Sequence, residues 1–226
     1  MNSEKLCESI SKITSGEVIL MFSRGKDSIA SYYQIKKYFH KIHLVYKYRV
    51  PELKFVQESI EYFEHKFEQK IIQIPHPAFY NQINKFLFQT PERAQLIHQM
   101  GLPTHQASDY DTLLPIDLNC PKAFIATGIR LNDSPMRRMV INKHGAFNAK
   151  KRTFYPIYDW SNEDIRICLK ENEIKLPIDY DLWGKSMDGL DYRFIKPLKD
   201  NLPEDYEIVK KYFPLIDLEI MRYEQI

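Results

Sequence analysis

The chain is poor in glycine and has almost no net charge. Its 226 residues include 7 glycines, and 32 Lys+Arg stand against 30 Asp+Glu, which gives a formal net charge of +2. This balance offers no whole-chain argument for binding to nucleic acid or to an acidic membrane. Because glycines are so few, each one that stands in a turn is more informative than usual.

Cysteine is also scarce, and long apolar runs are missing. Cys7, Cys120 and Cys168 are far apart, odd in number and form no CxxC pair, which argues against a disulfide framework and favours a reducing compartment. No apolar run approaches the roughly 20 residues that a membrane helix needs. The N-terminus lacks the apolar core of a signal peptide. We therefore expect a cytoplasmic protein without membrane association.

Apolar runs of strand length alternate with segments of helical periodicity over the first part of the chain. Such alternation predicts a parallel sheet with right-handed crossovers. Residues 131–155 are polar and basic and show little periodicity. The expected strands are residues 17–22, 41–48, 70–77 and 122–130, and the expected helices are residues 4–15, 27–39, 52–67 and 161–174.

We predict an α/β fold with a doubly wound, mostly parallel sheet of about five strands and helices on both faces. A helical C-terminal extension follows it. Residues 1–226 are expected to form a single domain, with a core over residues 1–160 and a mainly helical part over residues 161–226. Ser161 and Asp164 have the spacing of a capping pair at the start of a helix.

The stretch VILMFSRGKDS (residues 18–28) runs from a buried strand into a charged turn and a helix. At such a junction the first N–H groups of the helix face outward and favour an anion. Gly25 permits close approach or a positive φ. Ser23 and Ser28 can donate hydrogen bonds, and Lys26 adds positive charge. The stretch therefore predicts a phosphate site.

Asp27 is unusual in an anion site because a carboxylate repels phosphate. Its presence is explained if a divalent cation lies between the carboxylate and the phosphates. The motif therefore predicts a polyphosphate bound with Mg²⁺, with the metal near Asp27. The Walker A pattern is absent, which disfavours a kinase-type ATPase.

The SRGKDS motif resembles the SGGKDS pyrophosphate loop of the adenine nucleotide alpha-hydrolase (PP-loop ATP pyrophosphatase) superfamily. Its members include ATP pyrophosphatases and phosphoadenylylsulfate (PAPS) reductases. Arg24 stands at a position where the loop usually has a glycine. The resemblance implies ATP and Mg²⁺ as cofactors. It implies that the phosphates contact Ser23, Arg24, Gly25, Lys26 and Ser28, with Lys26 and Asp27 in the catalytic set.

A second block, ATGIRLNDSPMRR (residues 126–138), is similar to the G-x-R-x-x-(E/D)-S-x-x-R pattern of the narrower PAPS reductase-like branch. Arg130 and Arg137 carry planar forks that suit phosphate or sulfate oxygens. Gly128 would let the chain turn across the top of the sheet. The resemblance adds the nucleotide-binding residues Gly128, Arg130, Asp133, Ser134, Arg137 and Arg138, with Arg130 also catalytic.

A third block, PIYDW, matches the branch's PI-x-DW run, and we expect Asp159 and Trp160 to be structural there. The adenosine-proximal Asp-Thr-Gly of many members is missing after the second strand. Tyr46 and its neighbours take its place, which leaves a stacked tyrosine or a backbone contact as the open alternatives for the base.

Two other family features are missing. The catalytic cysteine near the C-terminus is absent, and Leu190 and Arg193 stand where a GCxxC segment would place its thiols. His105 with Asp109 and Asp111 is more typical of a solvated loop than of a metal site. We therefore expect no iron–sulfur cluster and no structural zinc.

We predict an ATP-binding enzyme that cleaves ATP between the α- and β-phosphates and adenylylates an unknown acceptor, a small molecule or a nucleic acid. Two alternatives stay open: a PAPS reductase-like sulfonucleotide-binding or sulfur-transferring protein, and a non-catalytic nucleotide-binding or regulatory module. The basic run of residues 143–152 could contact nucleic acid. A homodimer could form through the aromatic tail residues Tyr206, Tyr212, Phe213 and Tyr223.

Overall fold

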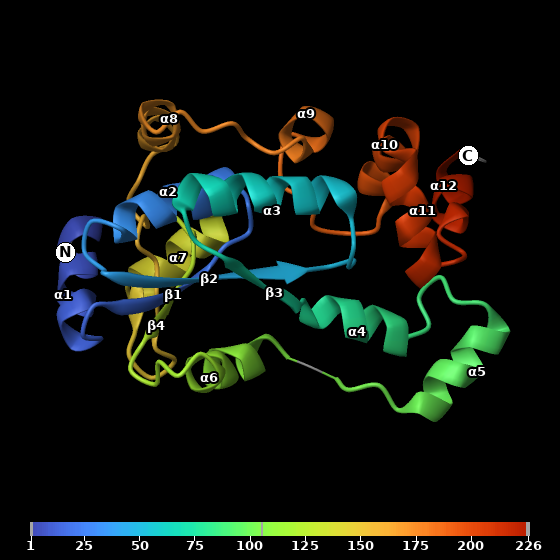
Figure 1. The fold of residues 1–226 in the computed structure, drawn as a ribbon, viewed down its shortest axis with the longest axis horizontal. Coiled ribbons are helices and arrows are strands. Elements are labelled where there is room, and N and C mark those ends of the chain that lie inside the picture. Colours follow the sequence, from blue (N-terminus) through green and yellow to red (C-terminus); the bar gives the residue numbers. More distant parts are fainter. Residues whose placement is uncertain (1, 105, 225–226) are drawn as a thin grey trace. The chain divides into compact units, whose positions relative to one another are not determined.

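The computed structural model describes residues 2–104 and 106–224, so His105 lies outside the described residues. The chain has an α/β fold with a six-stranded, mostly parallel sheet in the order β3-β2-β1-β4-β6-β5. Figure 1 shows α2 on one side of the strands and α6 on the other. The strands are β1 (Glu17–Met21), β2 (Lys41–Tyr48), β3 (Ile71–Pro75), β4 (Phe124–Ala126), β5 (Phe147–Asn148) and β6 (Thr153–Phe154).

Helices fill most of the remaining described chain, and none of them is long and apolar enough to cross a membrane. The helices are α1 (Ser3–Ile13), α2 (Lys26–Ile35), α3 (Lys54–Phe67), α4 (Pro77–Asn84), α5 (Pro91–Met100), α6 (Ala107–Asp117), α7 (Pro135–His144), α8 (Asn162–Glu171), α9 (Asp179–Trp183), α10 (Tyr192–Asn201), α11 (Pro203–Tyr212) and α12 (Asp217–Glu224).

Strand β1 is central to the sheet and carries its topological reversal. It pairs in parallel with β2 on one side and with β4 on the other. Val18, Ile19 and Leu20 are fully buried, as expected for a parallel strand covered on both faces. In open α/β sheets, ligands bind outside the carboxyl ends of the strands at such a reversal. The turn after β1 therefore lies where a ligand site is expected.

The predicted α/β class is confirmed, and the sheet has one strand more than the expected five or so. The strands β5 and β6, which had no predicted residue range, form an antiparallel pair of two residues each. They lie, with α7, inside the region that shows no periodicity. Segments this short are below the length at which alternation can be read. The capping box of Ser161 and Asp164 is confirmed at the start of α8.

The chain divides into two compact units, each built from separate segments. The first is Met1–Tyr46, Lys70–Ile72 and Ser108–Leu176, and the second is Lys47–Gln69, Gln73–Ala107 and Pro177–Ile226. Both units draw on residues from before and after position 160. The single domain with a core over residues 1–160 stays a prediction.

In the first unit, the segment of the third sequence block is structural. Ala30 of α2 and Ile165 of α8 belong to one buried cluster, and Trp160 packs against it. Asp159 accepts hydrogen bonds from the backbone N–H and the hydroxyl of Ser3. The block therefore joins α1 and α8 to α2, the helix that follows the SRGKDS turn.

In the second unit, aromatic residues of the C-terminal segment contribute to the interior. Tyr206 and Phe213 are buried, with 3% and 0% exposure. Tyr223 is half exposed and stacks on Tyr192 with ring centroids 4.7 Å apart. Two of the four aromatic residues named for a homodimer are thus used in packing, and the dimer stays a prediction.

His76 links the end of β3 to α4 in the second unit. Its Nδ1 accepts a hydrogen bond from the Ala78 backbone N–H at 3.0 Å, and the backbone N–H of His76 donates to the Tyr48 carbonyl at 2.7 Å. Burial, together with the positive charges of Arg49 and Lys47, lowers the pKa of His76 from 6.5 to about 4. The fold therefore favours the neutral imidazole, which acts as a helix cap.

The stability that this neutral cap contributes is fully present above pH 6.5 and is lost as the pH falls through about 4. We expect His76→Asn, which keeps a capping side chain without a titrating group, to flatten the fall in the free energy of unfolding over that range. Urea unfolding at several pH values measures it. His98→Asn, at an exposed histidine, is the control. Equal pH dependence in wild type and His76→Asn would contradict the assignment.

Candidate nucleotide site

The turn between β1 and α2 has the geometry of an anion site. Gly25 is the N-cap residue of α2, with φ −79° and no side chain to cap the helix. The first N–H groups of α2 are therefore not capped by a side chain at this position. The helix dipole adds partial positive charge at the same place. This is the arrangement that binds phosphate at helix amino ends.

Ser28 holds the turn together from below. Its hydroxyl donates to the Gly25 carbonyl at 2.8 Å and accepts from the backbone N–H and the hydroxyl of Ser23, each at 3.2 Å. Ser28 is buried, whereas Ser23 is exposed. Of the two predicted serines, Ser23 presents its hydroxyl at the surface, and Ser28 shapes the backbone.

Arg24 adopts the left-handed conformation in this turn, with φ +63°. The sequence suggested Gly25 for that role, and the finding explains why a glycine is usual at the position of Arg24. The side chain is 2% exposed, and its guanidinium lies over the ring of Tyr46, 5.3 Å from the centroid. A cation over an aromatic face is attracted by the ring quadrupole. The phosphate contact predicted for Arg24 stays a prediction, and its backbone is the part available for it.

Gly128 brings the second sequence block directly against the turn. A Cβ at this position would lie 2.9 Å from the carbonyl carbon and oxygen of Asp27 and 3.0 Å from the Ser28 nitrogen. These are backbone atoms at the start of α2, and they cannot rotate away. Glycine is therefore required at position 128 because the two chain segments approach each other closely there. Strand β4, which ends at Ala126, lies beside β1 and brings the two blocks together.

Arg130 is a buried cation surrounded by acceptors. It is 3% exposed, and its Nε lies 2.9 Å from the Asp27 carboxylate. One terminal nitrogen lies 3.2 Å from the Asp133 carboxylate and 3.1 Å from the Asn162 amide oxygen, and the other donates to the Trp160 carbonyl at 3.3 Å. Buried charges are tolerated when they are paired and hydrogen-bonded in this way. Arg130 therefore connects the start of α2 to the start of α8.

Asp27 lies between two cations. Lys26 Nζ is 2.9 Å from both carboxylate oxygens, and Arg130 approaches from the buried side. The side chains of Lys26 and Asp27 are 35% and 29% exposed, so this pair reaches the surface of the turn. The carboxylate is held in place by Arg130 and remains accessible beside the amino end of α2.

The rest of the second block forms the start of α7. Ser134 caps that helix by accepting from the Arg137 N–H at 3.2 Å, and Arg137 pairs with Asp133 at 2.6 Å. Arg138 is exposed and contacts the Asn132 amide oxygen at 3.4 Å. The structure thus brings Gly128, Arg130 and Asp133 to the turn. The nucleotide contacts of Ser134, Arg137 and Arg138 stay predictions.

The three cysteines are all buried. Cys7, Cys120 and Cys168 are 0%, 2% and 8% exposed. Burial raises the pKa of each thiol, to about 12 in the case of Cys7. A nucleophilic thiol needs a lowered pKa and exposure. None of them has the setting of a catalytic nucleophile.

Sequence reasoning missed two partners in this site. Asn162, at the start of α8, bonds Arg130, and the ring of Tyr46, near the end of β2, accommodates the Arg24 guanidinium. Both come from elements remote in sequence from the motifs they support. The only hint of the positive φ of Arg24 in the sequence was that the resembling loops have a glycine at this position.

The fold and this turn define a doubly wound α/β protein whose central strand ends in an anion-type turn. No protein-family model and no curated protein matches the chain. It is similar to the structure of U34-tRNA thiolase NcsA from Methanococcus maripaludis with its [4Fe-4S] cluster, with TM-score 0.50 and 15% identity, covering 95% of this chain and 79% of that one. The two chains therefore share a fold.

Two further structures are similar at lower TM-scores. NH3-dependent NAD synthetase from Campylobacter jejuni, in complex with the nitrate ion, has TM-score 0.49 and 13% identity, covering 97% of this chain and 92% of that one. A predicted subunit of tRNA methyltransferase from Methanocaldococcus jannaschii has TM-score 0.35 and 18% identity, covering 88% and 93%. The resemblance to the PP-loop superfamily is confirmed as a resemblance of fold.

The sequence-based prediction of no iron–sulfur cluster and no structural zinc is wrong. The NcsA structure with the same fold contains a [4Fe-4S] cluster, and Cys120 lies in a group of ligand-type side chains with Glu17 and His43. The exclusion rested on the missing GCxxC segment. A missing local pair excludes only a site held by that segment, because ligands can converge from separate strands.

Proposed function

We propose that the chain binds ATP at the SRGKDS turn and cleaves it between the α- and β-phosphates, releasing pyrophosphate and adenylylating an acceptor. The observation that carries the proposal is the amino end of α2, which has no side-chain cap at Gly25 and has Lys26 and Asp27 in its first turn. The shared PP-loop fold supports nucleotide binding at this turn.

The phosphates are held by backbone N–H groups at the start of α2, with the Ser23 hydroxyl and Lys26 at the rim. Lys26 contacts the Asp27 carboxylate at 2.9 Å. A polyphosphate at the first turn of α2 would give Lys26 a second anionic partner. Charge-assisted hydrogen bonds of this kind are about twice as strong as neutral ones. The ligand is therefore a polyanion, and its phosphates lie along the first turn of α2.

Asp27 provides an oxygen ligand of the type that Mg²⁺ prefers. Arg130 fixes the carboxylate at 2.9 Å, and the Asp27 side chain is still 29% exposed. Bound there together with the phosphates, Mg²⁺ would neutralise part of their charge. The donor set of this site thus fits a metal–nucleotide complex.

The reaction is a displacement at the α-phosphorus. An acceptor oxygen forms a bond to the α-phosphorus, the bond from that phosphorus to the α,β-bridging oxygen breaks, and pyrophosphate leaves with the electron pair. The acceptor proton passes to solvent. Lys26 and the backbone N–H groups of α2 stabilise the negative charge on the leaving pyrophosphate, so catalysis is mainly electrostatic. A second nucleophile then displaces AMP from the acceptor.

Sulfonucleotide reduction is less well supported by the same site. That chemistry needs a reactive thiol, and the three cysteines are buried with raised pKa values. A calorimetric comparison of ATP with PAPS separates the two candidates. Tighter binding of PAPS than of ATP would favour the sulfonucleotide reading.

Two measurements test the proposal. First, chromatography of reactions containing ATP, Mg²⁺ and candidate acceptors should show AMP and pyrophosphate as products. Second, Lys26→Met should weaken binding of ATP with Mg²⁺ about 10- to 100-fold in calorimetry, because it removes a charge-assisted contact worth about 1.5–3 kcal/mol. Lys37→Met, which removes an exposed lysine just after α2, should leave binding unchanged.

The outcomes separate catalysis from binding. AMP and pyrophosphate from wild type, with weaker binding in Lys26→Met, support the whole proposal. ADP and phosphate as the only products would contradict cleavage at the α-phosphorus. Binding that is weakened in Lys26→Met but never accompanied by turnover would assign the chain to a nucleotide-binding module instead.

A further inference from the structure

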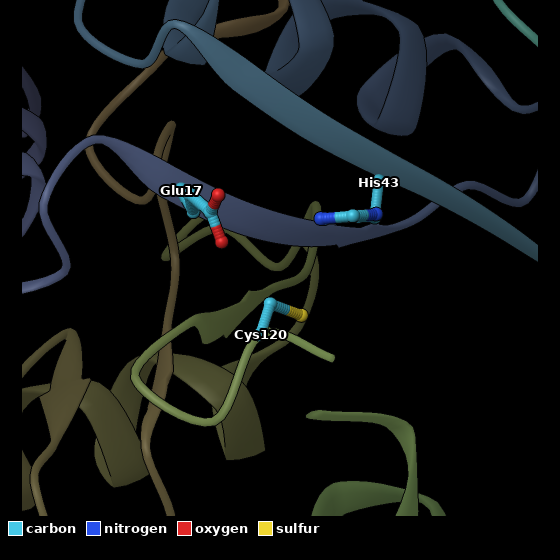
Figure 2. Close-up of side chains that lie close together, drawn as sticks. All are labelled: Glu17, His43 and Cys120. Atoms are coloured by element: carbon cyan, nitrogen blue, oxygen red, sulfur yellow. The ribbon is translucent and has the colours of Figure 1, made fainter. Parts of the chain in front are cut away.

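Three ligand-type side chains converge in the first unit, away from the phosphate turn. A ligand atom of each of Glu17, His43 and Cys120 lies within 4.8 Å of those of the other two. Figure 2 shows the Glu17 carboxylate and the His43 ring coming from two neighbouring strands, with the Cys120 thiol approaching from the loop below them. The three groups offer oxygen, nitrogen and sulfur.

This group lies at the opposite end of the strands from the nucleotide site. Glu17 is the first residue of β1, His43 is near the start of β2, and Cys120 precedes β4. The phosphate turn follows the last residue of β1, a strand of five residues and thus about 13 Å long. The cluster is therefore a separate site, and nothing in the proposed ATP chemistry uses it.

The register of the sheet explains the convergence. Glu17 pairs with Lys41 and Ile19 pairs with His43 in the parallel β1–β2 ladder. Because side chains alternate with a period of two, Glu17 and His43 lie on the same face of the sheet. Cys120 is held in a turn after α6, where its N–H donates to the Pro115 carbonyl at 2.8 Å.

The imidazole of His43 carries an unsatisfied group at this place. Its Nε2 is buried and has no hydrogen-bond partner among the described residues. A buried polar atom without a partner costs about 1–3 kcal/mol, so its presence calls for a ligand. Cys120 is 2% exposed, so its thiol faces the interior of the same cluster.

We propose that Glu17, His43 and Cys120 bind one Zn²⁺ ion. Nitrogen, sulfur and carboxylate oxygen are the ligands that zinc takes in proteins, and three protein ligands leave a fourth position for water. Thiolate and imidazole together select a borderline-soft ion over Mg²⁺ or Ca²⁺. When the ion binds, the Cys120 thiol releases its proton to the buffer and coordinates as thiolate.

Lys41 is the existing partner of Glu17, at 3.1 Å from Oε1. Its side chain is 51% exposed, so it can turn into solvent when the carboxylate takes a metal. Exposed ion pairs contribute roughly 0–1 kcal/mol, which is small beside the free energy of zinc binding. The ion pair therefore does not block the site.

Cobalt provides the spectroscopic test. The full chain is freed of metal with a chelator and titrated with Co²⁺, whose thiolate complex gives a charge-transfer absorption band. We expect one Co²⁺ per chain, displaced by Zn²⁺. Cys120→Ser should abolish the band and weaken Zn²⁺ binding about 100-fold, measured by competition with a chromophoric chelator. Cys168→Ser, at another buried cysteine, should keep both.

His43→Gln decides the matter if Cys120→Ser fails to fold, as judged by circular dichroism. It should weaken Zn²⁺ binding by a similar factor while retaining the cysteine. A wild-type chain without the charge-transfer band, or a band that persists in Cys120→Ser, would overturn the proposal. ATP binding at the turn after β1 is measured independently, so the two proposals fail separately.

Discussion

Replacing Arg130 with methionine should lower the free energy of unfolding by about 3 kcal/mol. The guanidinium is 3% exposed and contacts Asp27, Asp133 and the Asn162 amide. Breaking a buried ion pair by removing one partner costs about 3–5 kcal/mol because the other charge loses its compensation. Asp27 keeps Lys26 and Asp133 keeps Arg137, which places the expected loss at the lower end. Urea unfolding followed by circular dichroism measures it.

The matched control is Arg138→Met. Arg138 is exposed, and its contacts to the Leu131 carbonyl and the Asn132 amide are long, at 3.5 and 3.4 Å. A change there should stay within about 0.5 kcal/mol of wild type. If Arg130→Met were as stable as Arg138→Met, the buried network would not hold the start of α2 as described. A double-mutant cycle with Asp27→Asn isolates the Arg130–Asp27 coupling.

Replacing Gly128 with alanine should destabilise the protein by about 2 kcal/mol and weaken nucleotide binding at the same time. The added Cβ would lie 2.9 Å from the Asp27 carbonyl group. Overpacking of this kind costs about 1–3 kcal/mol. Because the atoms in the way are backbone at the first turn of α2, the N–H groups proposed to bind the phosphates must move with them. Unfolding in urea and calorimetry with ATP and Mg²⁺ measure the two effects.

Gly189→Ala is the control for this prediction. The nearest atom to a Cβ at Gly189 is a side-chain carboxylate oxygen of Asp191 at 3.1 Å, and the nearest backbone atom lies 3.9 Å away. It should therefore change stability less than Gly128→Ala and leave nucleotide binding unchanged. A Gly128→Ala variant that binds ATP like wild type would show that the second block does not set the position of the turn.

Much of the fold followed from hydrophobic pattern. The bounds of β2 were predicted to the residue, because a run of strand length stands there between polar segments. β5, β6 and α7 were missed because none shows a readable period. The two-residue strands are too short, and α7 buries only Ile141 among its residues.

The position of the candidate nucleotide site in the chain was predicted, and its side-chain geometry was missed. The motif placed Gly25, Lys26 and Asp27 at a strand–helix junction, where the structure has them. It did not show that Arg24 carries the positive φ and turns its side chain onto Tyr46. Such details depend on which strand lies beside the turn, and a local pattern does not contain that information.

What the sequence by itself determined was the class of fold and the strand–turn–helix junction at SRGKDS, since both rest on local order: the period of the apolar residues, the turn residues and the charged residues that follow them. What only the tertiary structure decided was which distant residues meet. Asn162 reaches Arg130, Gly128 reaches Asp27, and Glu17, His43 and Cys120 converge at the other end of the strands. These contacts follow from strand order and register, which bring together side chains that are up to about a hundred residues apart in the chain.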